Sequence, residues 1–199
     1  ARDGDNLAHK SPHMPWYDGP IVLQALDRLE PMPSPVDRPL RLPIQDVYKF
    51  DERRIIVGRI ETGILRVGDT LLFSPHNRTA VVKSIEAWNA AVPPVEARAG
   101  QTVGVTLDEQ IFVERGNIAS HDTHAPVLTS VLRTNVFWLH DKPLLVGNGY
   151  KLKLATEDAQ VTVQSIDRVI DTQTLAGKKG EAVHRNEVAE VTLRARKML

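Results

Sequence analysis

The chain has 199 residues, enough for one large domain or two small ones, and its 42% hydrophobic and 25% charged residues are typical of a globular protein. Its 25 lysines and arginines balance its 25 aspartates and glutamates, which argues against a broad basic face for nucleic-acid backbones. It has no cysteine and no apolar run near the roughly 18 residues that cross a bilayer, so we expect no disulfide, no thiolate metal site, no membrane partner and a cytoplasmic location.

Residues 1–30 begin with a polar stretch containing glycine and proline, which predicts irregular structure. Apolar residues then recur at helical spacing after Pro20 and end near Glu30. A helix this short is marginal in water, so we expect it to pack on something else. The polar start at Ala1 indicates a piece of a longer protein. Residues 31–39 are dense in proline, which forbids helix and predicts an extended linker.

Residues 40–125 show apolar positions with a period of two, which is typical of strands that bury one face. Glycine and proline separate the segments, and no long helical pattern intervenes. Many short strands with frequent turns predict a closed β-barrel, a form that leaves no exposed sheet edge. The expected strands are residues 42–49, 54–60, 70–73, 79–86, 102–107 and 117–120.

Residues 126–199 continue the all-β pattern. Residues 150–154 alternate apolar and cationic side chains, and further strands are expected at 161–163 and 188–193. No closing turn and final strand follow Arg194, so we expect this second barrel to be incomplete. The predicted fold class is therefore all-β, with tandem barrels after a short helical segment.

The sequence contains no convincing catalytic or nucleotide-binding motif. The Gly177-Lys178 pair lacks the upstream glycine and the following serine or threonine of a phosphate-binding loop. His121 and His124 lie close together, but a polar loop between domains explains them better than a metal site. No nucleophile elbow is present. We therefore predict no catalytic, cofactor-binding or metal-binding residues in this chain.

Two tryptophans need separate explanations. Trp138 lies on a strongly β-forming segment and is predicted to belong to a core. Trp88 follows Ile85 and Glu86 and precedes a proline-containing loop. It is either an exposed aromatic that binds a partner or a plug at the end of the barrel.

Several strings, taken together, resemble one family of proteins. Residues 14–20 resemble the end of the G domain of elongation factor one-alpha and its relatives, and Pro39–Lys49, Val57–Asp69 and Glu114–Asn117 resemble their second domain. The resemblance implies that GTP and magnesium bind a G domain outside this chain, and that this G domain is one partner. It also implies four parts: a G-domain remnant (1–30), a linker (31–39), barrel domain two (40–125) and an incomplete barrel domain three (126–199).

Strings in the third part resemble a narrower family, the GTPase subunit of bacterial sulfate adenylyltransferase, including forms fused to adenylylsulfate kinase. The resemblance implies a non-catalytic barrel region whose parent couples GTP hydrolysis to adenylyl sulfate formation. A separate adenylyltransferase catalytic subunit would be the partner, and this fragment alone would be inactive. The strings are Val136–Leu139, Lys142–Leu144, Tyr150–Thr156, Ile166–Asp171 and Arg185–Val191.

An alternative resemblance is to the aminoacyl-tRNA-binding barrels of elongation factors. In those proteins a glutamate on a second-domain strand helps form the pocket for the terminal adenosine, and Glu86 matches it. Thr106 stands where the bacterial factor has an aliphatic wall, which weakens the match and makes tRNA the less favoured partner. Glu86, Thr106 and Trp88 are thus candidates for a partner or adenosine-like pocket. Glu86 is equally explained as a strand-end carboxylate in water.

Overall fold

A computed structural model of the chain describes residues 3–49, 52–87, 90–170 and 176–199. The chain folds as two compact units, Ala1–Ser34 and Pro35–Leu199, and each has its own internal structure. Among the described residues, no helix is long and apolar enough to span a membrane.

The first unit contains one short helix, α1 (Val22–Asp27), which buries none of its residues. Backbone hydrogen bonds tie its start to the preceding loop, from the N–H of Val22 to the Asn6 carbonyl and from the N–H of Leu23 to the Leu7 carbonyl. The helix ends before the expected position near Glu30. The apolar side chains of Val22, Leu23 and Leu26 are 43%, 52% and 54% exposed, and the expectation that the helix packs on something else stays a prediction.

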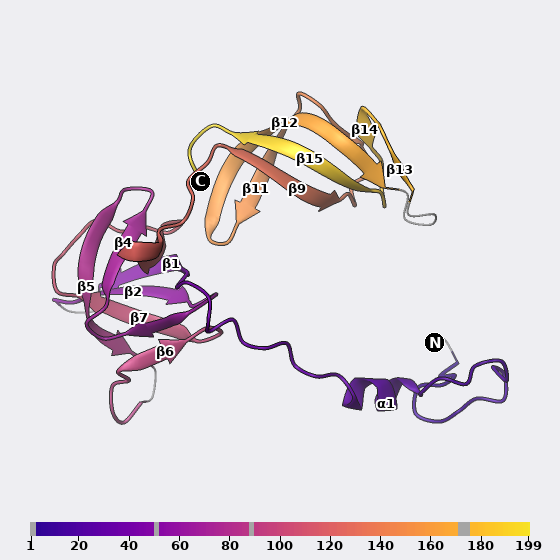
Figure 1. Cartoon of the computed structure of the whole chain (residues 1–199), viewed down its shortest axis with the longest axis horizontal. Coiled ribbons are helices and arrows are strands. Elements are labelled where there is room, and N and C mark those ends of the chain that lie inside the picture. The colour runs from indigo at the N-terminus through magenta and orange to yellow at the C-terminus, as the bar shows by residue number, and fades with distance from the viewer. Residues whose placement is uncertain (1–2, 50–51, 88–89, 171–175) are drawn as a thin grey trace. The chain divides into compact units, whose positions relative to one another are not determined.

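The second unit begins with a closed six-stranded barrel in the order β1-β2-β7-β5-β4-β8, drawn in violet to pink in Figure 1. The predicted all-β fold class with a closed barrel is confirmed. A two-stranded ribbon of β3 and β6 adds to it. The strands are β1 (Leu42–Lys49), β2 (Arg54–Arg59), β3 (Ile64–Arg66), β4 (Thr70–Ser74), β5 (Arg78–Glu86), β6 (Glu96–Arg98), β7 (Thr102–Leu107) and β8 (Ile118–His121).

The barrel interior is filled by aliphatic side chains and one phenylalanine, Phe73, which is 1% exposed. They come from alternate positions of the strands, as the period of two predicts. Gly63 is a position where a side chain does not fit. Its φ is +81°, and a Cβ there would lie 2.6 Å from the Cα of Leu40. The turn at Gly63, within Val57–Asp69, therefore packs its backbone against the backbone of Leu40.

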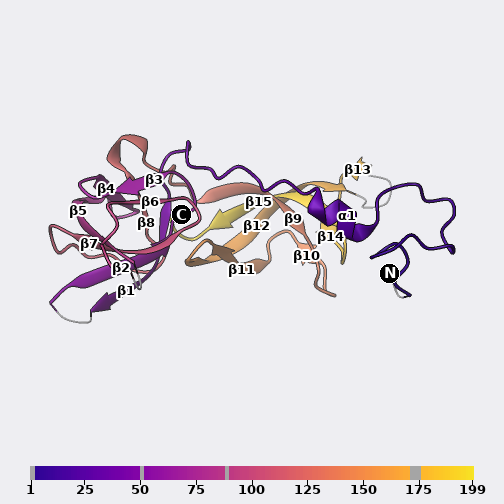
Figure 2. The same cartoon turned by 90° about the horizontal axis from the view of Figure 1, so that it is seen from below.

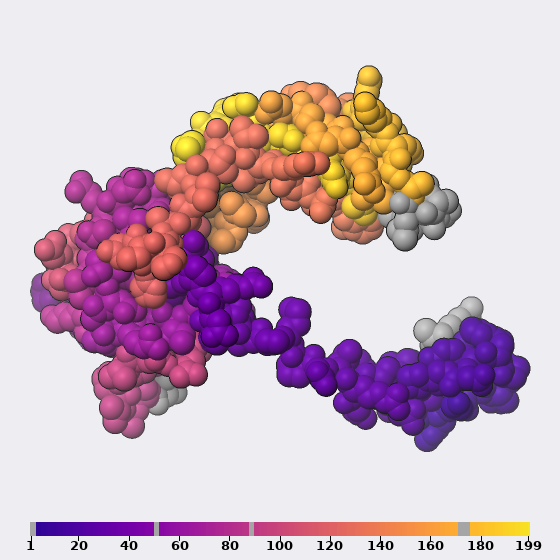
Figure 3. All heavy atoms as spheres, in the orientation of Figure 1, coloured from indigo at the N-terminus to yellow at the C-terminus, as the bar shows by residue number. Residues whose placement is uncertain are grey.

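After the short 3-10 helix η1 (Asp122–His124), the chain forms a second β structure (Figures 1 and 2). Its main sheet has the order β11-β12-β15-β9, with β13 beside β12, and it does not close within the described residues. Figure 3 shows the atoms of β9 beside those of β15 in yellow. The strands are β9 (Val131–Phe137), β10 (Leu144–Leu145), β11 (Gly149–Leu154), β12 (Glu157–Ile170), β13 (Gly177–Lys178), β14 (Ala182–Val183) and β15 (Val188–Ala195).

This second β structure has its own core. The ribbon of β10 and β14 contributes Leu144 and Val183, and the main sheet contributes Val163, Val169 and Val191, each at most 3% exposed. One face of the main sheet is therefore buried, and the alternate residues point to the other face.

Comparing Gly63 with Gly68 separates the effect of the close contact with Leu40 from the effect of a positive φ. Both have positive φ, at +81° and +91°, but a Cβ at Gly68 would meet nothing within 4 Å. We expect Gly68→Ala to cost about 1 kcal/mol of unfolding free energy through its φ alone. Gly63→Ala should cost roughly 1–3 kcal/mol more because of overlap with Leu40. Urea unfolding of the two variants measures the difference, and equal losses would contradict the packing argument.

Candidate functional site

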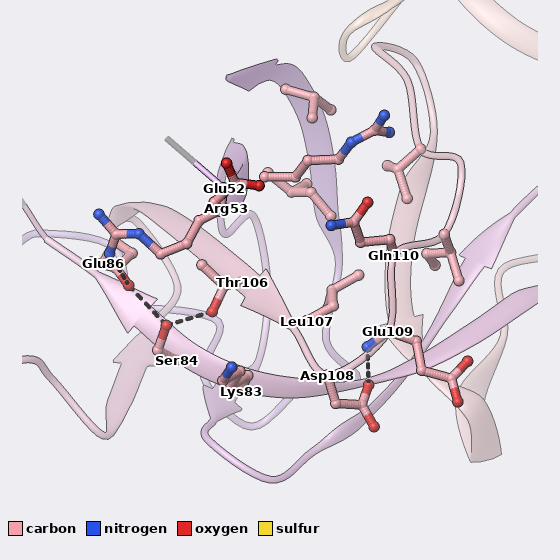
Figure 4. A pocket seen from close by; sticks show the side chains of 15 residues that line it. Glu52, Arg53, Lys83, Ser84, Glu86, Thr106, Leu107, Asp108, Glu109 and Gln110 are labelled. Atoms are coloured by element: carbon pink, nitrogen blue, oxygen red, sulfur yellow. Dashed lines mark hydrogen bonds and ion pairs between the residues drawn. The ribbon is translucent and has the colours of Figure 1, made fainter. Parts of the chain in front are cut away.

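A cavity of about 360 Å³ opens on the barrel beside the ends of β5 and β7. Figure 4 shows its polar side, where Ser84, Glu86 and Thr106 point toward one another from these two strands. Ser84 and Thr106 are direct cross-strand neighbours, and Glu86 lies opposite Gly104. The pairing of β5 with β7 thus brings together residues that lie about twenty positions apart in the sequence.

A β-bulge in β5 turns these side chains toward the cavity. Val82 and Ile85 are both buried in the core, at 1% and 0% exposure, although they lie three positions apart. Uninterrupted alternation would place them on opposite faces. The register shift between Val82 and Ser84 restores Ile85 to the core, so Ser84 and Glu86 face outward.

The polar side of the cavity is a chain of hydrogen bonds. The Ser84 hydroxyl donates to Glu86 Oε1 at 2.8 Å and lies 2.5 Å from the Thr106 hydroxyl. The Arg53 Nη1 lies 3.7 Å from Glu86 Oε1. The Glu86 side chain is 33% exposed, so its carboxylate is both partnered and open to a ligand.

Glycine at position 104 makes room for this arrangement. A Cβ there would lie 2.6 Å from Ile55 Cγ2 and 3.3 Å from the Glu86 Cβ. A side chain at this position would therefore overlap Ile55 and would require the Glu86 Cβ to shift by a few tenths of an ångström.

The lining of the cavity also contains apolar residues, namely Val47, Ile56, Leu107, Ile111 and Val113. The charged residues of the lining nearly balance. They comprise four carboxylates and three cations, namely Glu52, Glu86, Asp108, Glu109, Arg53, Arg54 and Lys83.

One of these carboxylates, that of Asp108, has a structural role. Asp108 Oδ1 accepts hydrogen bonds from the backbone N–H groups of Val81 and Glu109, at 2.8 and 2.9 Å. Its oxygen therefore satisfies the strand end, and Glu86 is the better placed acceptor for a ligand.

The structure brings together two of the three predicted pocket residues, Glu86 and Thr106. Trp88 lies outside the described residues. Sequence analysis missed Ser84 and Arg53. The only signal for Ser84 was its position two residues before Glu86, but the buried Ile85 between them gives no hint of a bulge.

The histidine positions serve local contacts. His121 Nε2 lies 3.0 Å from Asp69 Oδ2, and the same oxygen accepts the backbone N–H of Arg66 at 2.7 Å. His124 Nδ1 lies 2.9 Å from the Thr123 hydroxyl. In the ranges that the structure describes, no three histidine or carboxylate groups are placed to hold a metal ion.

A second group of residues surrounds Trp138 in the last part of the chain, and we call it the Trp138 cluster. The indole Nε1 donates to the Lys142 carbonyl at 2.7 Å, and the ring meets Tyr150 edge-on at 5.4 Å. The backbone of Trp138 pairs with Asn186 and Glu187 at 2.7 and 3.0 Å. Trp138 is packed against the second core from its edge rather than buried within it.

The Gly177-Lys178 pair lies in the short strand β13 and has a structural contact. Lys178 Nζ lies 3.2 Å from Glu187 Oε1. The pKa of Glu187 is lowered first by the hydrogen bond from the backbone N–H of His184 and then by Lys178, so this carboxylate stays ionised.

Residues 131–199 match a family model described as GTP-eEF1A C-terminal domain-like. The chain is 37% identical over 175 residues to elongation factor 1-alpha of Staphylothermus marinus, covering 86% of this chain and 40% of that protein. It is 32% identical over 199 residues to sulfate adenylyltransferase subunit 1 of Shewanella oneidensis, covering 97% and 41%. This chain belongs to the translation elongation factor EF1A/Tu-like GTPase superfamily.

Within this superfamily, the chain corresponds to the region of the two β-domains. A further elongation factor 1-alpha, from Sulfolobus acidocaldarius, is 38% identical over 186 residues. The crystal structure of sup35 complexed with GMPPNP matches with a TM-score of 0.74 at 21% identity, over 100% of this chain and 49% of that one, which supports the fold alone. The chain spans less than half the length of the curated relatives it matches.

The hydrogen bond between Ser84 and Glu86 predicts energetic coupling. Because the acceptor is a partly exposed carboxylate, we expect a coupling free energy of about 1 kcal/mol in a double-mutant cycle of Ser84→Ala with Glu86→Gln. Urea unfolding of the single and double variants measures it. Ser84→Ala with Glu109→Gln is the matched control, because Glu109 lines the same cavity without bonding Ser84. Equal coupling in both cycles would contradict the geometry.

Proposed function

We propose that this chain is the non-catalytic β-domain region of the GTP-hydrolysing subunit of a sulfate adenylyltransferase. In this proposal a separate catalytic subunit transfers adenylyl: a sulfate oxygen attacks the α-phosphorus of ATP, the α–β bond breaks, and pyrophosphate leaves. The β-domains hold that subunit and a G domain, which binds GTP and magnesium. The complex would act in the cytoplasm.

The observation that carries the proposal is the Trp138 cluster. Several separate strings of the third part resemble the sulfate adenylyltransferase family, and Trp138, Lys142, Tyr150 and Glu187 come from four of them. Lys142, Tyr150 and Glu187 each contact Trp138, through two hydrogen bonds and one ring contact. Residues that form one packed unit support a resemblance better than scattered matches do. A sulfate adenylyltransferase subunit 1 also aligns with 97% of the chain.

A second candidate function is the binding of aminoacyl-tRNA, as in elongation factor 1-alpha. The specific observation in its favour is the open cavity beside Glu86, together with relatives of that name at 37% and 38% identity. Against it, the Thr106 hydroxyl is bonded to Ser84 where an aliphatic wall is expected, and the cavity lining has no excess of cations to meet RNA phosphates.

The two functions are separated by assaying a protein that includes this region with its G domain. We expect GTP to increase adenylyl sulfate and pyrophosphate formation from ATP and sulfate when the adenylyltransferase subunit is present. Protection of aminoacyl-tRNA from hydrolysis is measured in parallel. Protection without any effect of GTP on adenylyl sulfate formation would overturn the proposal in favour of the second function.

Glu86→Gln sharpens this comparison. If the chain serves sulfate activation, the variant should change GTP-stimulated adenylyl sulfate formation by less than about twofold. If it binds the terminal adenosine, aminoacyl-tRNA affinity should fall by about tenfold, since a hydrogen bond to a charged group is lost. Glu109→Gln, in the same cavity lining, is the control and should leave both activities unchanged.

A further inference from the structure

The outward face of the second β structure has an apolar row at one end. Phe137 lies opposite Val188, Val188 lies opposite Ile170, and Ile170 lies opposite Gly177. The row therefore crosses four strands, β9, β15, β12 and β13. The residues next to it, Val169 and Ala189, are 0% exposed in the core, so members of the row point away from the core.

The row is open to solvent at its β9 end. Phe137 is 55% exposed, and Leu139, two residues further along the chain, is 64% exposed. Val188 and Ile170 are half-buried. The next row on the same face is polar, with Asn135 opposite Glu190 and Glu190 opposite Arg168. The polar row thus bounds the apolar row, which lies at one end of the sheet, where a partner would cover it.

Arg168 supplies a charge beside this row. A Cβ at Gly177 would overlap Arg168 Nε, so the glycine lets the arginine side chain lie across β13. Its cross-strand neighbour Glu190 is bound instead to Arg133, at 3.1 Å. In the ranges that the structure describes, no carboxylate lies within ion-pair distance of the Arg168 guanidinium, whereas Arg133 has two, Glu190 and Asp167.

We propose that Phe137, Leu139, Val188, Ile170 and Arg168 form a docking surface for a partner protein segment that presents apolar side chains beside a carboxylate. The apolar side chains cover the row, and the carboxylate pairs with the guanidinium of Arg168. We call this group the outer-face patch.

Charge and rigidity favour this occupant. A single arginine suits one carboxylate, while a nucleic acid would need several cations to neutralise its phosphates. The patch residues other than Leu139 lie on paired strands, so little conformational freedom is lost on binding. The inference does not rest on the proposed function, because it concerns a face remote in sequence from Glu86 and is the same for either activity.

The test uses the whole 199-residue chain and a short fluorescein-labelled peptide that alternates leucine and glutamate. We expect saturable binding by fluorescence anisotropy. A matched peptide with lysine in place of glutamate should bind at least about tenfold more weakly, because it places a like charge beside Arg168. Absence of saturation with the glutamate peptide, or equal binding of the two peptides, would overturn the proposal.

Variants locate the binding on the patch. Phe137→Ser and Arg168→Glu should each lower the affinity for the glutamate peptide about tenfold. Arg168→Glu should also make the chain bind the lysine peptide more tightly than the glutamate peptide. Gly177→Ala should also weaken binding without any change of charge, because it displaces Arg168. Arg194→Glu, at an exposed position on the same face of β15, is the control and should bind as the parent chain does.

Phe137 and Arg168 are exposed, so these variants are expected to fold, and circular dichroism with thermal melting checks this. If Arg168→Glu binds with unchanged affinity and unchanged peptide preference, the peptide binds another surface and the proposal is wrong.

Discussion

The barrel depends on a short antiparallel pairing between β1 and β8 that closes it. Only two residue pairs join these strands, Leu42 with Ala119 and Pro43 with Ile118, and the N–H of Ile44 extends the pairing by donating to the Asn117 carbonyl at 2.8 Å. Ile44 also pairs with Gly58 of β2, and this second pairing continues to Lys49 through a register irregularity between Ile44 and Asp46. The single strand β1 therefore pairs with both β8 and β2. The positions of β5 and β7, and so of the cavity between their ends, follow from this closure.

Sequence patterns were sufficient for much of this architecture. The expected strands of residues 40–125 all appear, because each has enough alternating apolar positions to show a period of two. The ribbon strands β3 and β6 are three residues each, too short for a period to show. In the second β structure, alternation in 150–154 and 188–193 marks real strands, whereas the two-residue strands β10, β13 and β14 carry no pattern of their own.

The candidate site was predictable only in part, for a physical reason. Glu86 and Thr106 were found through resemblance to a known pocket, and the structure does place them on adjoining strands. Ser84 was not found, because a bulge is set by tertiary pairing and leaves no local sequence signal. The contact of Arg53 with Glu86 joins the end of the β1–β2 hairpin to β5, and such long-range contacts cannot be derived from spacing along the chain.

The bulge in β5 also bears on how such a barrel diversifies. On both sides of the bulge, β5 buries one set of side chains, such as Val82 and Ile85, and turns the others outward. Substitutions at Ser84 and Glu86 alter the lining of the cavity, while Val82 and Ile85 continue to fill the core. Evolution can therefore exchange the recognition chemistry of the barrel without repacking its interior. A scaffold with that separation is well suited to relatives as different in name as an elongation factor and a sulfate adenylyltransferase subunit.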